Sequence, residues 1–213
     1  MNDVSPDPPA SVRNAPPILE ILQRILSRPA FQGKHVLEIA AGSGYHAPIF
    51  ASALSHVVWQ PTDPDPAARA QIAARVAQAA LPNLRPPLDL DVRDSVWPLD
   101  STDTVVCINM IHISPWQATE SLFEGARRLM PAEGMVVTYG PYSIAGDFQA
   151  DSNIAFDQSL RSRNPAWGIR DVADVARAAA DSGFRHDETV PMPANNLVLV
   201  FRRTRPALFP KMF

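Results

Sequence analysis

Cysteine is nearly absent from this chain of 213 residues, because Cys107 is the only one. An internal disulfide is therefore impossible, which favours a reducing compartment. The sequence also has no apolar run of the roughly 18 residues that a membrane helix needs. Its polar, proline-rich first residues do not follow the pattern of a signal peptide. We therefore expect a cytoplasmic protein without a membrane partner.

Strong charge of either sign is missing as well, since the formal net charge is -3. A nucleic-acid partner usually requires a basic field, so none is expected. The five histidines and the single cysteine show no ligand-like spacing, so we expect no metal site. What the chain does have is a 46% hydrophobic fraction and 22 prolines, which predict a full core with constrained loops.

Apolar segments and helical segments alternate along most of the sequence, which predicts βαβ units. We expect strands at residues 35–39, 56–59, 88–92, 104–108 and 135–139. Two further strands, 184–190 and 197–202, are joined by a linker too short for a crossover helix, so they should form an antiparallel hairpin. The predicted fold is α/β: a Rossmann-like, doubly wound, seven-stranded sheet that is mostly parallel.

The chain is expected to form one domain, residues 14–213, behind a flexible tail of residues 1–13. Apolar residues from Ile18 to Leu26 recur at helical spacing, and Asn14 would cap that helix. Residues 140–170 are rich in aromatic and polar side chains and suit a lid over an active site. Further helices are expected from about residue 47 and at 66–81, 117–130 and 171–181.

The loop after the first strand, residues 40–44, contains only small residues. Ligands of open α/β sheets bind beyond the carboxyl ends of the strands, and glycines there permit close approach of a ligand. The loop could instead be merely a tight turn, or its Gly42–Ala47 segment could be a dinucleotide fingerprint. Glu38, just before the loop, would repel a pyrophosphate but suits a ligand that carries an ammonium and a sulfonium.

The segment Val36–Gly44 resembles motif I of class I S-adenosylmethionine-dependent methyltransferases, with Ala40 in place of the first glycine. Met130–Gly134 resembles the turn before the fifth strand of that fold. Nearly the whole chain is similar to the domain-of-unknown-function 938 (DUF938) family of methyltransferase-like proteins, through Arg13-Asn14, Ile39–His46, Gln60–Asp63, Asn109–Ile113, Tyr139–Tyr142 and the block from Ser152 to Arg170. The resemblance implies S-adenosylmethionine as the cofactor and leaves the substrate open.

Asp63 lies at the end of the second predicted strand, where a carboxylate can accept hydrogen bonds from both ribose hydroxyls. Alternatively, Asp63 belongs to a turn or caps the next helix. Asp65 is the better placed of the two for the cap. The resemblance implies that Asp91 and Val92 contact the adenine. Asp94 is a competing candidate for this contact, and a loop-capping role is the alternative. It also brings Asn109 to the methionine part. The predicted cofactor contacts are Arg13, Asn14, Glu38, Ala40, Gly42, Ser43, Gly44, Asp63, Asp91, Val92 and Asn109.

His112 is a candidate general base because its ordinary pKa lies near neutrality, although a packed histidine fits equally well. Tyr142 is the second candidate proton acceptor. Arg161 and Arg170 could grip a substrate carboxylate or phosphate, or else pair with Asp157 and Asp171. The predicted substrate contacts are Tyr139, Asn153, Asp157, Arg161, Trp167 and Arg170.

The sequence therefore predicts a methyltransferase that moves a methyl group by SN2 displacement to a small molecule. Two alternatives stay open: an NAD(P)-binding oxidoreductase and a non-catalytic cofactor-binding protein. A homodimer is left open as the assembly.

Overall fold

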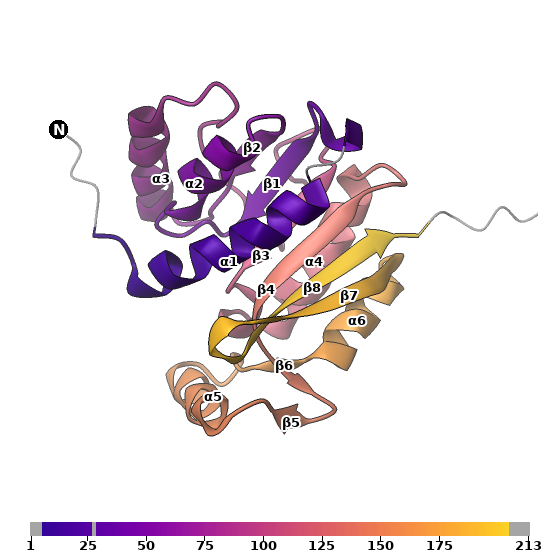
Figure 1. Cartoon of the computed structure of the whole chain (residues 1–213). Helices are drawn as coiled ribbons and strands as arrows, with labels where there is room; N and C mark the ends of the chain where they lie inside the picture. Colours follow the sequence, from indigo (N-terminus) through magenta and orange to yellow (C-terminus); the bar gives the residue numbers. More distant parts are fainter. Residues whose placement is uncertain (1–5, 27–28, 205–213) are drawn as a thin grey trace, which may run out of the picture.

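The computed structural model describes residues 6–26 and 29–204, and its centre is a sheet with the strand order β2-β1-β3-β4-β8-β7 (Figure 1). The first four strands in this order run parallel, and β8 is antiparallel to both of its neighbours. The predicted α/β fold with a C-terminal antiparallel hairpin is confirmed. The strands are β1 (His35–Ile39), β2 (Val58–Pro61), β3 (Thr104–Ile108), β4 (Met135–Ile144), β7 (Phe184–Met192) and β8 (Asn196–Arg203).

Helices cover both faces of the sheet, as a doubly wound fold requires (Figure 1). One core cluster joins Leu22, Phe50 and Trp59 on the face of α1, α2 and α3. The other joins Leu122 and Val175 on the face of α4 and α6. No helix in the described ranges is long and apolar enough to cross a membrane. The helices are α1 (Pro9–Leu26), α2 (His46–Ala53), α3 (Pro66–Ala79), α4 (Trp116–Leu129), α5 (Asp151–Arg163) and α6 (Val172–Asp181).

The strand predicted at residues 88–92 is wrong. That part of the chain contributes only two isolated bridges, Trp59 with Leu84 and Thr62 with Leu88. Pro86 and Pro87 lie between the bridges, and neither can donate a ladder hydrogen bond. The main path of the sheet therefore has six strands, and two short strands, β5 (Asp147–Phe148) and β6 (Arg170–Asp171), pair with β4 beside it.

Helix α1 begins at Pro9, so the flexible tail predicted to residue 13 is wrong for residues 9–13, and its residues 1–5 lie outside the described part of the chain. Asn14 is consequently not the cap but a buried residue within the helix. The misplaced start came from Pro16 and Pro17, because prolines are common in a first helical turn. Both instead lie inside α1.

Strand β4 runs to Ile144, five residues beyond its predicted end at Tyr139. Its extension pairs Gly140 with Leu197 of β8, and Tyr142 with Arg170 of β6. The start of the predicted lid is therefore part of the sheet, and α5 forms the main body of the insertion (Figure 1).

Gly44 lies where the loop after β1 packs on α3. Its φ is +71°, and an added Cβ would come within 2.9 Å of the Cα and Cγ1 of Ile72. Gly42 also has a positive φ, +58°, but a Cβ there would meet nothing within 4 Å. A side chain at Gly42 would therefore cost only backbone strain, whereas a side chain at Gly44 would cost strain and also clash with Ile72.

We expect Gly44→Ala to lower the free energy of unfolding by about 2–4 kcal/mol, because it combines left-handed strain with overpacking. Gly42→Ala should cost only the strain, about 1–2 kcal/mol. Urea denaturation of both variants measures the difference. Equal losses would mean that contact with Ile72 does not govern the choice of glycine at position 44.

Candidate functional site

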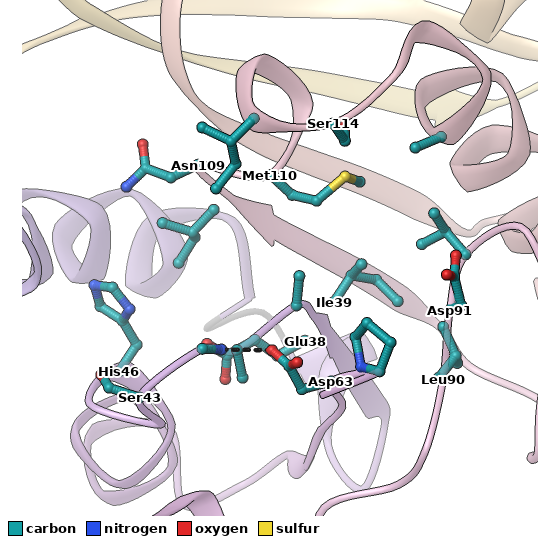
Figure 2. Close-up of a pocket in the computed structure, with 18 of the residues that line it drawn as sticks. Glu38, Ile39, Ser43, His46, Asp63, Leu90, Asp91, Asn109, Met110 and Ser114 are labelled. Carbon is teal, nitrogen blue, oxygen red and sulfur yellow. Dashed lines mark hydrogen bonds between the residues drawn. The ribbon is translucent and has the colours of Figure 1, made fainter. Parts of the chain in front are cut away.

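A cavity of about 510 Å³ lies at the carboxyl ends of β1, β2 and β3. Figure 2 shows Asn109, Met110 and Ser114 on one side of it and Ser43 and Asp63 on the other. This is the edge at which open α/β sheets bind ligands. The structure brings together here most of the predicted cofactor residues: Glu38, Ala40, Gly42, Ser43, Asp63, Asp91, Val92 and Asn109.

The carboxylate of Asp63 ties the glycine loop to the end of β2. Its Oδ2 accepts a hydrogen bond of 2.9 Å from the Gly42 N–H, and its Oδ1 accepts one of 2.9 Å from the Asp65 N–H (Figure 2). Burial raises the pKa of Asp63, while these two backbone bonds act to lower it. Asp65 caps α3 through the Ala67 N–H, as expected, which leaves Asp63 to line the cavity.

Glu38 is almost completely buried, with a relative exposure of 1%. Its Oε2 accepts a 2.7 Å hydrogen bond from the indole N–H of Trp59. Burial raises the pKa of Glu38 to about 7, although the bond from Trp59 acts in the opposite direction. A positive charge in the adjoining cavity would favour the ionised form of this carboxyl group.

The other end of the cavity is formed by residues 90–93. Leu90 and Val92 are buried, while Asp91 pairs with the guanidinium of Arg93, which lowers the pKa of Asp91. Asp94, the competing candidate, turns its Oδ2 toward the Asp91 N–H instead. The arrangement places apolar surface beside a carboxylate, which suits a flat heterocycle that carries an amino group.

Not every predicted cofactor residue lines this cavity. Arg13 and Asn14 line a second cavity of about 510 Å³, together with Tyr139 and Asn153. Gly44 supports the loop by packing on α3. Asn109, directly after β3, lines both cavities and is therefore part of the wall of each.

His46 is a site residue that the sequence did not single out. Its Nε2 lies 2.7 Å from the Oδ1 of the buried Asn14, and it also lines the first cavity. Burial lowers the pKa of His46 to about 4, so the ring is neutral at pH 7. Its position directly after the glycine loop was the available signal, but its partner on α1 is 32 residues away in sequence.

His112 lines the second cavity and is 5% exposed. Its ring packs edge-on against Phe156, with 5.6 Å between the centroids. A Cβ on Gly140 would lie 3.1 Å from the His112 Nδ1, so the glycine leaves room for the ring. Burial lowers the pKa of His112 to about 4, assisted by the charges of Arg170 and Arg163. The ring is therefore neutral at pH 7 and a weak proton acceptor.

Tyr142 lies in the core, with a relative exposure of 1%. Its hydroxyl donates to the Oγ1 of Thr138 at 2.8 Å, and burial raises its pKa. This placement argues against Tyr142 as a proton acceptor. The side chain faces the core because it lies on β4, which the sequence had ended three residues earlier.

The predicted substrate residues are divided among different places. Asp157 accepts hydrogen bonds from Arg161 and from the Ile169 N–H, both at 2.7 Å, so it holds α5 to the segment before β6. Arg170 donates to the carbonyls of Ser114 and Ala166. Both arginines line a third cavity, next to α4 and α6, and neither lines the first two, so their role in substrate binding stays a prediction. Trp167 lines the first cavity.

The described ranges contain no cluster of three or more His, Cys, Asp or Glu side chains that could hold a metal ion.

The fold is also found in S-adenosylmethionine-dependent methyltransferases. The chain is similar to the methyltransferase SibL (TM-score 0.75, 20% identity) and to an O-methyltransferase family 2 protein from Planctomyces limnophilus in complex with apigenin (TM-score 0.77, 16% identity). It is also similar to CalO1, a methyltransferase in calicheamicin biosynthesis with S-adenosylhomocysteine (SAH) bound (TM-score 0.69, 20% identity). Each match covers 92% of this chain but only 56%, 58% and 55% of those proteins, respectively.

The class defined by fold is therefore methyltransferase-like. A family model described as a protein of unknown function, DUF938, matches residues 6–203. The chain belongs to the DUF938 family, which confirms the resemblance drawn from the sequence over nearly its whole length.

The buried Glu38 gives a testable dependence of stability on pH. The pKa of Glu38 is 4.5 in the unfolded chain and about 7 in the folded state. The contribution of Glu38 to the stability of the fold is therefore fully present below pH 4.5 and is lost as the pH rises through 7. Glu38→Gln stays neutral and keeps an acceptor for Trp59. As the pH rises from 4.5 to 7, we expect the free energy of unfolding of Glu38→Gln, relative to that of the native protein, to increase by about 3 kcal/mol.

Urea denaturation of Glu38→Gln across this pH range measures the gain, with the exposed Glu20→Gln on α1 as the control. A constant difference between Glu38→Gln and the native protein at all pH values would show that Glu38 ionises normally in the fold.

Proposed function

We propose that this chain is an S-adenosylmethionine-dependent methyltransferase that acts on a small molecule. The observation that carries the proposal is the buried Asp63 carboxylate, hydrogen-bonded to the Gly42 N–H at the rim of the first cavity. A carboxylate at the end of the second strand is the group that accepts ribose hydroxyls in nucleotide-binding α/β folds. The similarity to methyltransferase structures supports the same reading.

The first cavity fits this cofactor in size and in chemistry. Its volume of about 510 Å³ lies within the usual range for small-molecule sites. Asp63 would hold the ribose, and the edge formed by Leu90, Asp91 and Val92 would hold the adenine. The glycine loop and Asn109 would hold the methionine part, with Glu38 beneath it.

The charges of the cavity argue against a nicotinamide dinucleotide. Its lining includes the carboxyl groups of Glu38, Asp63 and Asp91 and one guanidinium, that of Arg93, which is already paired with Asp91. Such a surface favours a cationic ligand over a pyrophosphate. The Gly42 N–H, which a pyrophosphate would need, already donates to Asp63.

When bound, the cofactor supplies an electrophilic methyl group on a sulfonium. The protein's part is to orient the acceptor and to exclude water, and orientation alone can contribute about 7–11 kcal/mol at best. Asn109 lines both cavities, so the acceptor would occupy the second cavity and approach the methyl group beside this residue. The neutral His112 ring would position an acceptor hydroxyl by a hydrogen bond.

A small-molecule partner, the cytoplasm as compartment, the lack of a nucleic-acid partner and an open question of homodimerisation stay predictions from the sequence. The net charge of -3 supports the view that the acceptor is not a nucleic acid.

Asp63→Asn should weaken SAH binding by about tenfold to a hundredfold, because a hydrogen bond to a charged group contributes about 1.5–3 kcal/mol. Isothermal titration calorimetry measures the loss. Asp89→Asn is the matched control, since Asp89 is exposed and pairs with Arg69 nearby. Similar losses in both variants would point to surface charge rather than to a ribose contact.

Ligand-induced stabilisation separates the methyltransferase from the oxidoreductase alternative. A ligand at 100 times its Kd adds about 2.7 kcal/mol to the stability of the folded state. We expect SAH to raise the melting temperature and NADH to leave it unchanged. Stabilisation by NADH alone would overturn the proposed function. Binding of S-adenosylmethionine without methyl transfer to a broad acceptor library would favour the non-catalytic alternative.

A further inference from the structure

The second cavity has a distinctive charge. Its lining contains the guanidinium of Arg13 and, among the described residues, no carboxylate. The remaining polar groups are neutral side chains, including Ser152, Tyr139 and His112. Apolar walls are supplied by Phe156 and by prolines. The described lining therefore carries one positive charge and no negative charge, in contrast to the carboxylate-rich first cavity.

Arg13 makes no ion pair with any residue in the described ranges. Arg24, on the same helix, shows the ordinary arrangement: its Nη2 lies 2.8 Å from a carboxylate oxygen of Glu188. The charge of Arg13 instead influences the phenol of Tyr139. Burial raises the pKa of Tyr139, and the Asn14 amide and the charge of Arg13 partly oppose this shift. An unpaired guanidinium beside a neutral phenol offers two donors to one anionic group.

His112 lines the same cavity. The His112 ring is 5% exposed, lines the cavity, and makes no side-chain hydrogen bond within the described part of the chain. A ring nitrogen of His112 is therefore available to a polar atom of a ligand. The ring packs edge-on against Phe156 and lies close to the backbone of Gly140.

We propose that the second cavity binds an acceptor that carries a carboxylate, held by Arg13 and the Tyr139 hydroxyl, with the acceptor's nucleophilic group toward His112 and Asn109. This inference rests on the proposed methyltransferase function and adds the chemical class of its substrate. The orientation follows from Asn109, the residue shared with the first cavity. A single guanidinium matches the single charge of a carboxylate, and the flat Phe156 ring suits an aromatic acid.

The test uses two probes of nearly the same shape, the anion 4-hydroxybenzoate and the neutral 4-hydroxybenzamide, in which an NH2 donor replaces one carboxylate oxygen. Each is titrated into the SAH-saturated protein and followed by NMR or calorimetry at millimolar concentrations. We expect the acid to bind at least about tenfold more tightly than the amide, since a charge-assisted hydrogen bond exceeds a neutral one by that amount. The preference should disappear in Arg13→Gln and be partly retained in Arg13→Lys.

Arg24→Gln removes the same charge from the same helix outside the cavity and should keep the preference. Equal binding of acid and amide, or no binding of either, overturns the proposal. Tighter binding of phenyl phosphate than of 4-hydroxybenzoate overturns the carboxylate assignment. The affinity for SAH is measured in every variant. Normal SAH binding without a preference for the acid over the amide refutes only this inference. Failure of the unsubstituted protein to bind SAH refutes the proposed function.

Discussion

The hydrogen bond between the Gly42 N–H and the Asp63 carboxylate is the contact on which the candidate site depends. It joins the loop after β1 to the end of β2, two segments that are adjacent in the sheet but 21 residues apart in sequence. The same carboxylate also accepts from Asp65 at the start of α3. One buried acid therefore fixes the positions of two loops and of the helix that follows the second.

The site combines groups that are unfavourable without a ligand. Glu38 is a carboxyl group in the core, and the ends of β1 and β3 place two residues with side chains, Ala40 and Asn109, at positive φ of 52° and 62°. Such backbone strain costs on the order of 1–3 kcal/mol for each residue and persists only where the surroundings impose it. Backbone strain and a buried carboxyl group thus coincide at the edge of the sheet where the first cavity opens.

The sequence predicted those features that depend on local pattern. The glycine loop and Asp63 follow directly from short apolar strands that end in small or acidic residues. Other features depend on tertiary contacts. Asn14 is buried because His46 reaches it from α2, and β4 is long because β8 and β6 pair with its extension. No local signal reports a partner that lies tens of residues away, so the start of α1 and the surroundings of Tyr142 were missed.

Helix α1 borders both cavities, with Ser11 on the first and Arg13 on the second. The two sites therefore have a common structural element in addition to Asn109. An adjustment of α1 on occupation of one cavity would also change the lining of the other, and thermodynamic linkage makes any such coupling reciprocal. A ligand in one cavity that strengthens binding in the other by a given factor is itself held more tightly by the same factor, so a shared helix can link the residence times of two different ligands.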